Sequence, residues 1–490
     1  MHRYIALFLP ILGGILLSIS FYSATLSFLV FIGLIPFALA VKQKEYVVES
    51  YIGVYLGGVV LSLLVTDWMR TTGGTELLMG SKSWLWLFLA LMFSPTWMLT
   101  LGLARKGYQY FPLICVLPVV WVCHEYIIIH YTSWLFGQSS WTMYQLGYAL
   151  GDWTVLCQLA DIGGVATVSF FIVCITGCIV DIVVDNKKKY IGYMITLICA
   201  VLVYGFFYIQ TNIHPGITIA LMPDADDTVD ITNADLYVWT EGSYNVGCYT
   251  DKPQTMQELS DFTSQYRGVT VMGLKRLTGN NKYNSVAISN SDALLGFYDK
   301  VNLVPFSEFS PFGISGSKRY THGTHTSIFD IKDYSFGASI CYDIFFARLF
   351  RQYIQKNDID FFVNISSESF DKTGRLSRHA FISSKFRAIE TRRPIVRYAK
   401  DGISGIIDGS GNANVIEHTY LSKPKIMVLS LDKRKGFYMI YGDWIPYTCF
   451  ILCLTWCFNE KIRFYYHRAY GFYGCCRHDD GTTNDGYTIY

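Results

Sequence analysis

Long apolar segments separated by short polar connections make up most of the first 210 residues of the chain. A membrane-spanning helix needs roughly 20 predominantly apolar residues. Eight segments meet this requirement, at 4–20, 25–41, 51–67, 84–104, 112–130, 163–185, 190–209 and 444–459. We therefore predict a seven-helix transmembrane domain over residues 1–211 and an eighth transmembrane helix within residues 441–460. The remaining residues, 461–490, are expected to form a cytoplasmic tail.

Residues 212–440 have a different pattern, with charges, turn dipeptides and short apolar runs. Buried strands are predicted at GITIALMP (216–223), DLYVWTE (235–241), GVTVMGL (268–274), NSVAIS (284–289) and DFFVNIS (360–366). Apolar residues with helical spacing predict a helix over 375–392. Strands that alternate with helices indicate an α/β domain with a layered sheet.

Composition supports a membrane protein that carries a soluble domain. The chain is 51% hydrophobic and 16% charged, whereas soluble proteins have about 25% charged residues. A net charge of +2 with no basic stripe gives no reason to expect a nucleic-acid partner. No zinc-type cysteine spacing occurs, and His322 and His325 have no suitably spaced partner, so we expect no metal site.

Cations in the short connections predict the orientation of the spans. They occur in alternate connections, at Lys42 and Lys44, Arg105 and Lys106, Lys187 to Lys189, and Lys461 and Arg463. The connection 131–162, on the other side, has neither Lys nor Arg. Because positive residues stay in the cytoplasm, residues 212–440 are predicted to lie outside it, which is the periplasm of a bacterial inner membrane.

Three polar residues follow predicted strands, where α/β proteins commonly place functional groups. Cys341 ends the apolar run of SFGASICYDIFF, Glu241 ends DLYVWTE, and Lys300 lies in GFYDKVNLVPFSEFSPFG. Each has an ordinary structural alternative. A free cysteine packs as a small apolar residue, Glu241 suits a solvated loop, and Lys300 suits a surface pair with a nearby aspartate.

The order and approximate spacing of Glu241, Lys300 and Cys341 resemble the carbon–nitrogen hydrolase (nitrilase) domain. Several segments resemble one family of this group more specifically, the apolipoprotein N-acyltransferase family. These are YDKVNLVPFSEFSPFG, SICYDIFFARLFRQ, residues 387–411, YGDW, SWLFGQSS and QLADIGGVATVSF. The resemblance implies a multi-span α-helical membrane domain plus an α/β nitrilase-like (α-β-β-α sandwich) extracytoplasmic domain over residues 212–440.

The resemblance also implies an activity, without a cofactor. Cys341 would take an acyl chain from a phospholipid as a thioester and pass it to the N-terminal cysteine α-amine of a diacylglyceryl apolipoprotein. Glu241 would move the proton, and Lys300 would stabilise the thiolate and the oxyanion. We expect a multi-pass protein of the bacterial inner membrane that acts as a monomer, with its catalytic domain in the periplasm.

Further residues receive supporting roles from the same resemblance. Glu308 would buttress Lys300, the backbone N–H of Tyr342 would bind the oxyanion, and Asp343 would orient the site. Three aromatic side chains spaced every third residue suit either an apolar mouth for lipid or packing of the Lys300 loop, and both interpretations stay open. These side chains are Phe306, Phe309 and Phe312.

The chain departs from the family pattern outside the three principal groups. Thr240 replaces a proline, Asp343 replaces a glutamate, Ser369 replaces an aromatic residue, and KDG stands at 400–402 in place of NTG. Two alternative functions are a membrane-anchored nitrilase-type amidohydrolase and a catalytically inactive relative that binds lipid or lipoprotein. A transporter fits poorly because the spans contain no inverted repeat. Glu125, an acid within the fifth span, is expected to bond to a neighbouring helix.

Overall fold

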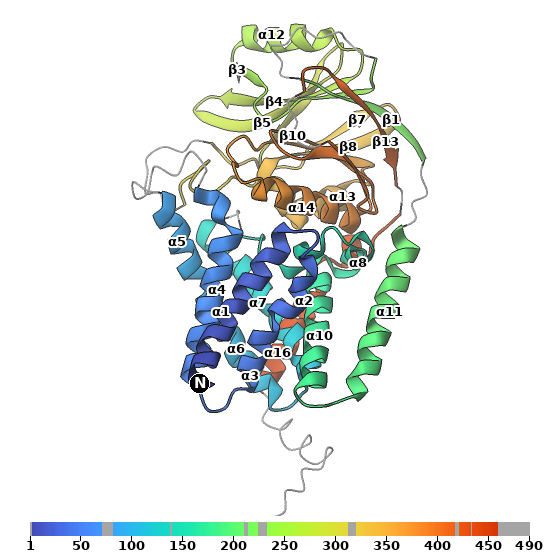
Figure 1. Ribbon diagram of the computed structural model, residues 1–490. Coiled ribbons are helices and arrows are strands. Elements are labelled where there is room, and N and C mark those ends of the chain that lie inside the picture. Colours follow the sequence, from blue (N-terminus) through green and yellow to red (C-terminus); the bar gives the residue numbers. More distant parts are fainter. Residues whose placement is uncertain are drawn as a thin grey trace, which may run out of the picture.

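The structure is a computed structural model in which a helical part adjoins a part built on two sheets (Figure 1). It describes residues 2–70, 82–137, 140–209, 214–223, 233–311, 320–416, 421–432 and 434–458. The predicted tail 461–490 lies outside the described residues.

Within the described residues, six helical segments are long and apolar enough to cross a membrane, so the chain is a multi-pass membrane protein. Four of them are α1 (His2–Tyr22), α4 (Val47–Val65), α7 (Leu113–Phe136) and α10 (Val165–Val183). The others are α11 (Lys189–Ile209) and the pair α5 (Lys82–Phe93) and α6 (Pro95–Tyr108), which together cover Trp86–Tyr108. All six coincide with predicted spans.

The other two predicted spans fall on shorter apolar helices. The segment 25–41 forms η1 (Ser27–Leu29), α2 (Val30–Gly33) and α3 (Ile35–Lys42). Its interruption has a physical reason, since Pro36 has no N–H to donate to the preceding turn. The segment 444–459 forms α16 (Trp444–Phe458). The boundaries of the transmembrane domain therefore stay a prediction.

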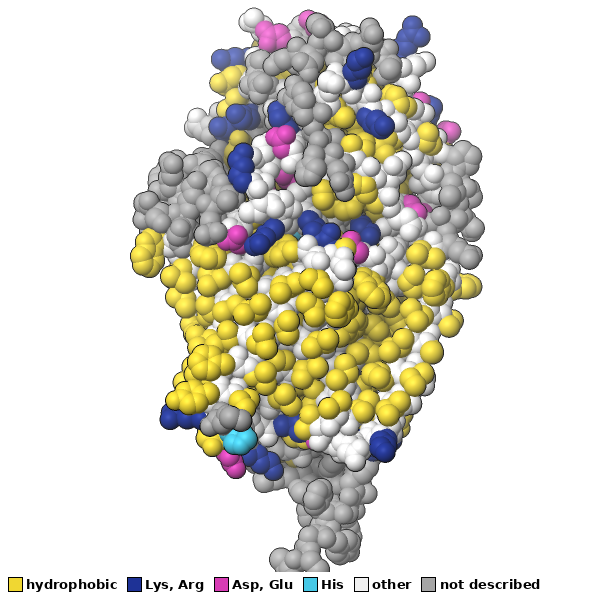
Figure 2. Space-filling view, in the orientation of Figure 1, with side chains coloured by type: hydrophobic (Ala, Val, Ile, Leu, Met, Phe, Trp, Pro, Cys, Tyr) yellow, Lys and Arg dark blue, Asp and Glu magenta, His cyan; other side chains and the backbone are white. Residues whose placement is uncertain are grey.

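The surface of the helical part has the polarity that a bilayer requires. Apolar side chains form a broad belt over the helices, with charged side chains gathered at its two edges (Figure 2). At the edge away from the sheets, cations of two connections meet, since Lys42 and Lys187 both contact Asp185. The Lys42 ammonium also lies 5.8 Å from the Tyr108 ring centroid.

Two sheets form the other part of the chain. The first has the order β13-β1-β2-β4-β5-β6, with β3 also paired to β4. Its strands are β1 (His214–Leu221), β2 (Leu236–Val238), β3 (Tyr244–Tyr249), β4 (Val269–Thr278), β5 (Asn281–Ser289), β6 (Leu294–Asp299) and β13 (Lys425–Leu431).

The second sheet has the order β12-β11-β10-β9-β8-β7. Its strands are β7 (Ile328–Ile331), β8 (Tyr334–Ile340), β9 (Phe361–Ser367), β10 (Ile395–Lys400), β11 (Ser404–Ile407) and β12 (Ala413–Ile416). Both sheets mix parallel and antiparallel pairs, as in β1 with β2 and β13. The five predicted strands and the predicted helix 375–392 are confirmed within a few residues.

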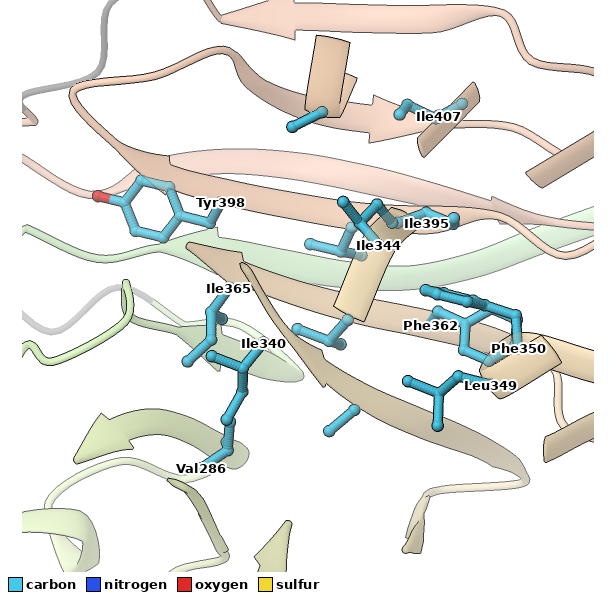
Figure 3. Close-up of a cluster of buried hydrophobic side chains, with 14 of the residues drawn as sticks. Val286, Ile340, Ile344, Leu349, Phe350, Phe362, Ile365, Ile395, Tyr398 and Ile407 are labelled. Atoms are coloured by element: carbon cyan, nitrogen blue, oxygen red, sulfur yellow. The ribbon is translucent and has the colours of Figure 1, made fainter. Parts of the chain in front are cut away.

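Apolar side chains of both sheets meet in one core. Val286 of the first sheet packs in the same cluster as Ile340, Phe362 and Ile365 of the second (Figure 3). Helix α12 (Pro253–Ser264) covers the outer face of the first sheet, whereas α13 (Ala347–Lys356) and α14 (Arg375–Thr391) cover the second (Figure 1). The layers are therefore α-β-β-α, which confirms the predicted fold class.

Helix α14 lies between the second sheet and the membrane helices, and almost all of it is buried. Leu376, Ala380 and Ala388 belong to the core of the sheets. Ile382, Phe386 and Ile389 belong to the core of the helical part. A helix that is apolar on two sides joins two layers, so α14 fixes the sheets to the membrane helices.

Two ion pairs, one buried and one partly exposed, reinforce the contact between the sheets and the helical part. Just after α14, the guanidinium of Arg392 lies 3.0 Å from Asp161 and donates to Gln158 at 2.7 Å. Asp161 belongs to the short helix α9 (Ala160–Gly163), which follows α8 (Thr154–Cys157) in the connection 131–162. Arg378, on α14 itself, pairs with Asp152 nearer the surface.

The two arginines are therefore predicted to differ in their contribution to stability. Arg392→Ala leaves the Asp161 carboxylate buried without its cation, which typically costs about 3–5 kcal/mol. Arg378→Ala removes a partly exposed pair, which is worth about 1 kcal/mol or less. Thermal unfolding of the detergent-solubilised protein, followed by intrinsic fluorescence, should show a much larger loss for Arg392→Ala. Equal shifts in the midpoint would contradict the assignment.

Candidate active site

Cys341 begins a tight turn directly after β8. The residue has a φ of 48°, in the left-handed region that side chains other than glycine rarely adopt. It opens η4 (Cys341–Phe345), and its side chain is half-buried. Such a conformation costs on the order of 1–3 kcal/mol and persists where the surroundings hold it. The alternative of an ordinary packed cysteine does not account for this strained position.

Lys300 follows β6 and is fully buried. Its ammonium lies 2.9 Å from the Glu308 Oε2 atom and 3.6 Å from the Glu241 Oε1 atom. Asp299, the aspartate that precedes Lys300 in the chain, instead accepts a hydrogen bond from Arg276. The Lys300 side chain is only 1% exposed, so the alternative of a surface cation does not hold.

Burial opposes the charged form of Lys300, but its surroundings outweigh this effect. Glu308, Cys341, Glu241 and Asp343 together raise the pKa of the Lys300 ammonium well above its ordinary value. The lysine therefore remains a cation at any physiological pH.

Glu241 lies in the turn after β2, close to β4. A Cβ atom at Gly273 would lie 2.5 Å from the Thr240 carbonyl oxygen, so only glycine allows this turn to approach. The carboxylate accepts hydrogen bonds from the Asn284 amide at 2.7 Å and from the Ser367 backbone N–H at 2.9 Å. Strands of both sheets thus hold Glu241 beside Lys300.

Asp343 connects the cysteine turn to the segment after Lys300. Its carboxylate accepts hydrogen bonds from the Tyr298 hydroxyl at 2.7 Å, the Asn302 backbone N–H at 2.8 Å and the Ile340 backbone N–H at 3.1 Å. Burial raises the pKa of Asp343, against the opposing effects of Lys300 and these hydrogen bonds. Asp343 therefore links the cysteine turn to β6 and to the segment that follows β6.

The connection 131–162 also contacts the cysteine turn. The Tyr342 hydroxyl donates to the Ser140 carbonyl at 3.2 Å, and the Thr142 hydroxyl donates to the Phe345 carbonyl at 3.0 Å. Glu125 of α7 holds the same connection farther on, accepting from the Leu146 backbone N–H at 2.8 Å. Leu146 opens the short 3-10 helix η3 (Leu146–Leu150), so the expected bond of Glu125 to a neighbouring helix is present.

Two of the three candidate aromatic side chains pack within the protein. Phe306 is buried with a φ of 64°, and its ring centroid lies 5.5 Å from that of Phe136 at the end of α7. Phe309 packs edge-to-face on His322, with ring centroids 4.9 Å apart. Phe312 lies outside the described residues. A lipid-lining role for these residues stays a prediction.

The thiol of Cys341 is held in its protonated form. Burial, with the carboxylates of Glu241 and Glu308, raises the pKa of the thiol to about 12, although Lys300 and a hydrogen bond with Ser366 act in the opposite direction. The resting site therefore contains a neutral thiol beside a carboxylate and an ammonium. A carboxylate in this position is able to accept the thiol proton as the sulfur attacks.

Two polar residues in this site were not predicted from the sequence. Asn284 bridges the acids, donating to Glu241 at 2.7 Å and to Glu308 at 3.0 Å. Ser366 contacts Cys341 and donates to Glu368 at 3.2 Å. In the sequence, Asn284 is a polar residue at the start of an apolar predicted strand. That pattern is too common to indicate a functional residue.

A cavity of about 420 Å³ opens beside Glu241. Polar and charged side chains form most of its lining, including Glu241, Glu308, Asn284, Ser367, Lys275 and Lys400. Among the described residues no group of three or more His, Cys, Asp or Glu side chains is arranged to hold a metal ion. Glu241 and Glu308, two acids of this lining, both contact the buried Lys300 ammonium, so the cavity adjoins the group formed by Cys341, Lys300 and the two carboxylates.

Two family models match the chain. Residues 13–178 match the apolipoprotein N-acyltransferase N-terminal domain, and residues 226–425 match the carbon-nitrogen hydrolase domain. In addition, Nit3 of Saccharomyces cerevisiae, a member of the nitrilase superfamily, aligns with 19% identity and a TM-score of 0.35, covering 46% of this chain and 92% of its own.

Curated relatives align with nearly the whole chain. The apolipoprotein N-acyltransferase of Geobacter metallireducens is 24% identical, over 90% of this chain and 92% of its own length. That of Thermotoga maritima is 24% identical over 94% of each chain. Since both domain models match and the relatives align along the full length, the chain belongs to the apolipoprotein N-acyltransferase family.

Proposed function

We propose that the chain transfers an acyl group from a phospholipid, through a thioester on Cys341, to the N-terminal amine of a diacylglyceryl apolipoprotein. The observation that carries this proposal is the buried Lys300 ammonium, which contacts Glu241 and Glu308 and interacts with Cys341. The relatives named above supply the substrate class through their names.

In the first half-reaction the thiol is the nucleophile. Glu241 takes the proton of Cys341 as the sulfur attacks the ester carbonyl of the phospholipid. The oxyanion that forms is stabilised by the Lys300 ammonium and the backbone N–H of Tyr342, and each such donor is worth about 10²–10³ in rate. Glu241 returns the proton to the glycerol oxygen as the carbon–oxygen bond breaks, which leaves lysophospholipid and an acyl thioester.

In the second half-reaction the lipoprotein amine attacks the thioester carbonyl. An α-amine has a pKa of about 7.7–8.0, so a useful fraction is neutral at physiological pH. Glu241 removes the remaining proton and passes it to the departing sulfur of Cys341. The conversion of a thioester to an amide is downhill, which drives the transfer to completion.

The remaining residues act through these groups. Glu308 fixes the Lys300 ammonium, and Asp343 is a positioning residue that joins the cysteine turn to the Lys300 segment. Because every one of these side chains comes from a single chain, we propose that the protein acts as a monomer.

We further propose that the protein resides in the bacterial inner membrane with the sheets in the periplasm. The cations of two short connections gather at the membrane edge away from the sheets, where Lys42 and Lys187 contact Asp185. By the positive-inside rule that edge faces the cytoplasm.

This orientation predicts the behaviour of reporter fusions. Alkaline phosphatase folds only outside the cytoplasm, so a fusion truncated after Lys188 should be inactive. A fusion truncated after Gln265, beyond α11, should be active. The reverse pattern would overturn the proposed orientation, and immunoblots of both fusions control for expression.

Acyl transfer is tested directly with the purified protein in detergent, a phospholipid with a labelled acyl chain and a synthetic diacylated lipopeptide. Without the lipopeptide we expect a labelled protein adduct that hydroxylamine releases, and with it we expect label on the peptide amine. Cys341→Ser should abolish both, and Glu241→Gln should lower the transfer rate by about 10²–10⁴. Free fatty acid as the sole labelled product would indicate an amidohydrolase-type enzyme, and neither adduct nor product would indicate an inactive relative.

The raised pKa of the Cys341 thiol predicts opposite effects of two substitutions. Glu241→Gln removes a negative charge that raises the thiol pKa, so more thiolate is present at pH 8 and methyl methanethiosulfonate should modify Cys341 faster. Lys300→Met removes the cation that lowers the thiol pKa, so modification should be slower.

Because the chain has 13 cysteines, the modification is measured by mass spectrometry on the peptide that contains Cys341. Both variants should nevertheless lose acyl transfer. Modification rates that move in the same direction in the two variants would contradict the proposed electrostatics of the thiol.

A further inference from the structure

The cavity beside Glu241 carries two lysines that the mechanism above does not use. Lys275 and Lys400 both line it, together with Tyr320 and Ser369. A volume of about 420 Å³ lies within the range of about 300–1,000 Å³ that small-molecule sites occupy. Cys341 is not among the described residues that line it, and the cavity adjoins the thiol through Glu241, so its volume suits a part of the substrate next to the reacting ester.

In the paired strands, each lysine lies opposite a residue that donates a hydrogen bond to Glu241. Lys275 of β4 is paired with Asn284 of β5, whose amide donates to Glu241. Lys400 of β10 is paired with Ser367 of β9, whose backbone N–H donates to Glu241. Since paired strands lie about 4.7–4.9 Å apart, the two lysines approach the carboxylate from the two sheets.

The charges of this cavity are arranged in two layers. In the inner layer, Glu241 and Glu308 both contact the buried Lys300 ammonium, which compensates one of their two negative charges. In the outer layer Lys275 is exposed and Lys400 is half-buried. Asp401, which follows Lys400 in the chain, is an acid near this outer layer, and its carboxylate accepts a hydrogen bond from the Ser369 hydroxyl at 2.5 Å.

A further cation lies next to the cavity. The Lys282 ammonium is 5.1 Å from the ring centroid of Tyr320, and the Tyr320 backbone N–H donates to the Glu308 carbonyl at 3.1 Å. The outer layer is thus basic around a catalytic carboxylate. An anionic group attached to the substrate a short distance from the reacting carbonyl is the chemistry that such a rim binds.

We propose that Lys275 and Lys400 bind the phosphodiester of the phospholipid donor, and so position its ester carbonyl at Cys341. The inference rests on the proposed function, since the phosphodiester is joined to the reacting ester through the glycerol backbone. Lys275 and Lys400 are specificity-determining residues in this assignment, and they favour donors that carry a phosphodiester over phosphate-free lipids.

The test uses the full chain in detergent and measures the initial rate of labelled thioester formation against the concentration of phosphatidylglycerol. Lys275→Ala/Lys400→Ala should raise the KM for this donor by about tenfold, the effect expected of two partly exposed ion pairs, with a much smaller change in kcat. Lys356→Ala, an exposed lysine of α13 away from the cavity, is the matched control and should leave the KM unchanged.

Three further measurements make the test specific. The ratio of kcat/KM for phosphatidylglycerol to that for diacylglycerol with the same chains should fall about tenfold in the double variant. Added salt should raise the KM of the unmodified chain more than that of the variant, because salt screens exposed charges. Inorganic phosphate should inhibit no more than sodium chloride of equal ionic strength, and stronger inhibition would mean that the site binds free phosphate rather than a lipid.

The outcomes separate this inference from the proposed function. If the unmodified chain forms no labelled thioester, the proposed function fails. If it forms the thioester and the double variant has the same KM and the same donor ratio, only the phosphodiester site is overturned. The thermal midpoint of the variant, compared with that of Lys356→Ala, excludes misfolding as the cause of a raised KM.

Discussion

The burial of α14 between the second sheet and the membrane helices is the constraint on which the rest of the structure depends. The helix supplies apolar side chains to both cores. It also reaches the cysteine turn, because the Arg387 guanidinium donates to the Phe345 carbonyl, which the Thr142 hydroxyl contacts as well. The position of Cys341 is therefore set jointly by the sheet, by α14 and by the membrane part. A nitrilase-like domain that could rotate freely on a tether would lack these contacts.

A buried ammonium is the second constraint, and it explains why so many acids surround one cysteine. Taking the Lys300 charge out of water costs several kcal/mol unless nearby charges compensate it. Glu308 and Glu241 compensate it by direct contact, and Asp343 acts at longer range. The same carboxylates raise the pKa of the Cys341 thiol. A resting neutral thiol is thus the consequence of stabilising the lysine, and a general base beside it becomes a chemical necessity.

The sequence predicted the helices and strands better than it predicted the contacts between residues that are distant in the chain. Apolar runs located the strands, and helical spacing located α14, because burial selects residue types at regular intervals. The order of Glu241, Lys300 and Cys341 predicted which groups would meet, but it gave no indication of Asn284 or Ser366, whose roles depend on pairing between distant strands. The interpretation of Phe306 also depended on tertiary structure. A regular aromatic spacing suits either a lipid mouth or packing, and only the contact with Phe136 shows where the ring lies.

The polar groups of the site do not by themselves distinguish acyl transfer from hydrolysis, since water and an amine attack the same thioester. The surroundings of the cysteine turn bear on this question, because the turn packs on apolar side chains. Tyr342 packs on Phe345 and Phe346 with ring centroids 5.5 and 5.2 Å apart, and its hydroxyl reaches the connection 131–162. Withdrawing an acyl chain from lipid costs about 0.8 kcal/mol per CH₂, so a thioester seated against the membrane part keeps its chain in apolar surroundings. A cysteine turn that the membrane part holds therefore suits a lipid acyl donor, whose chain need not leave apolar surroundings during the transfer.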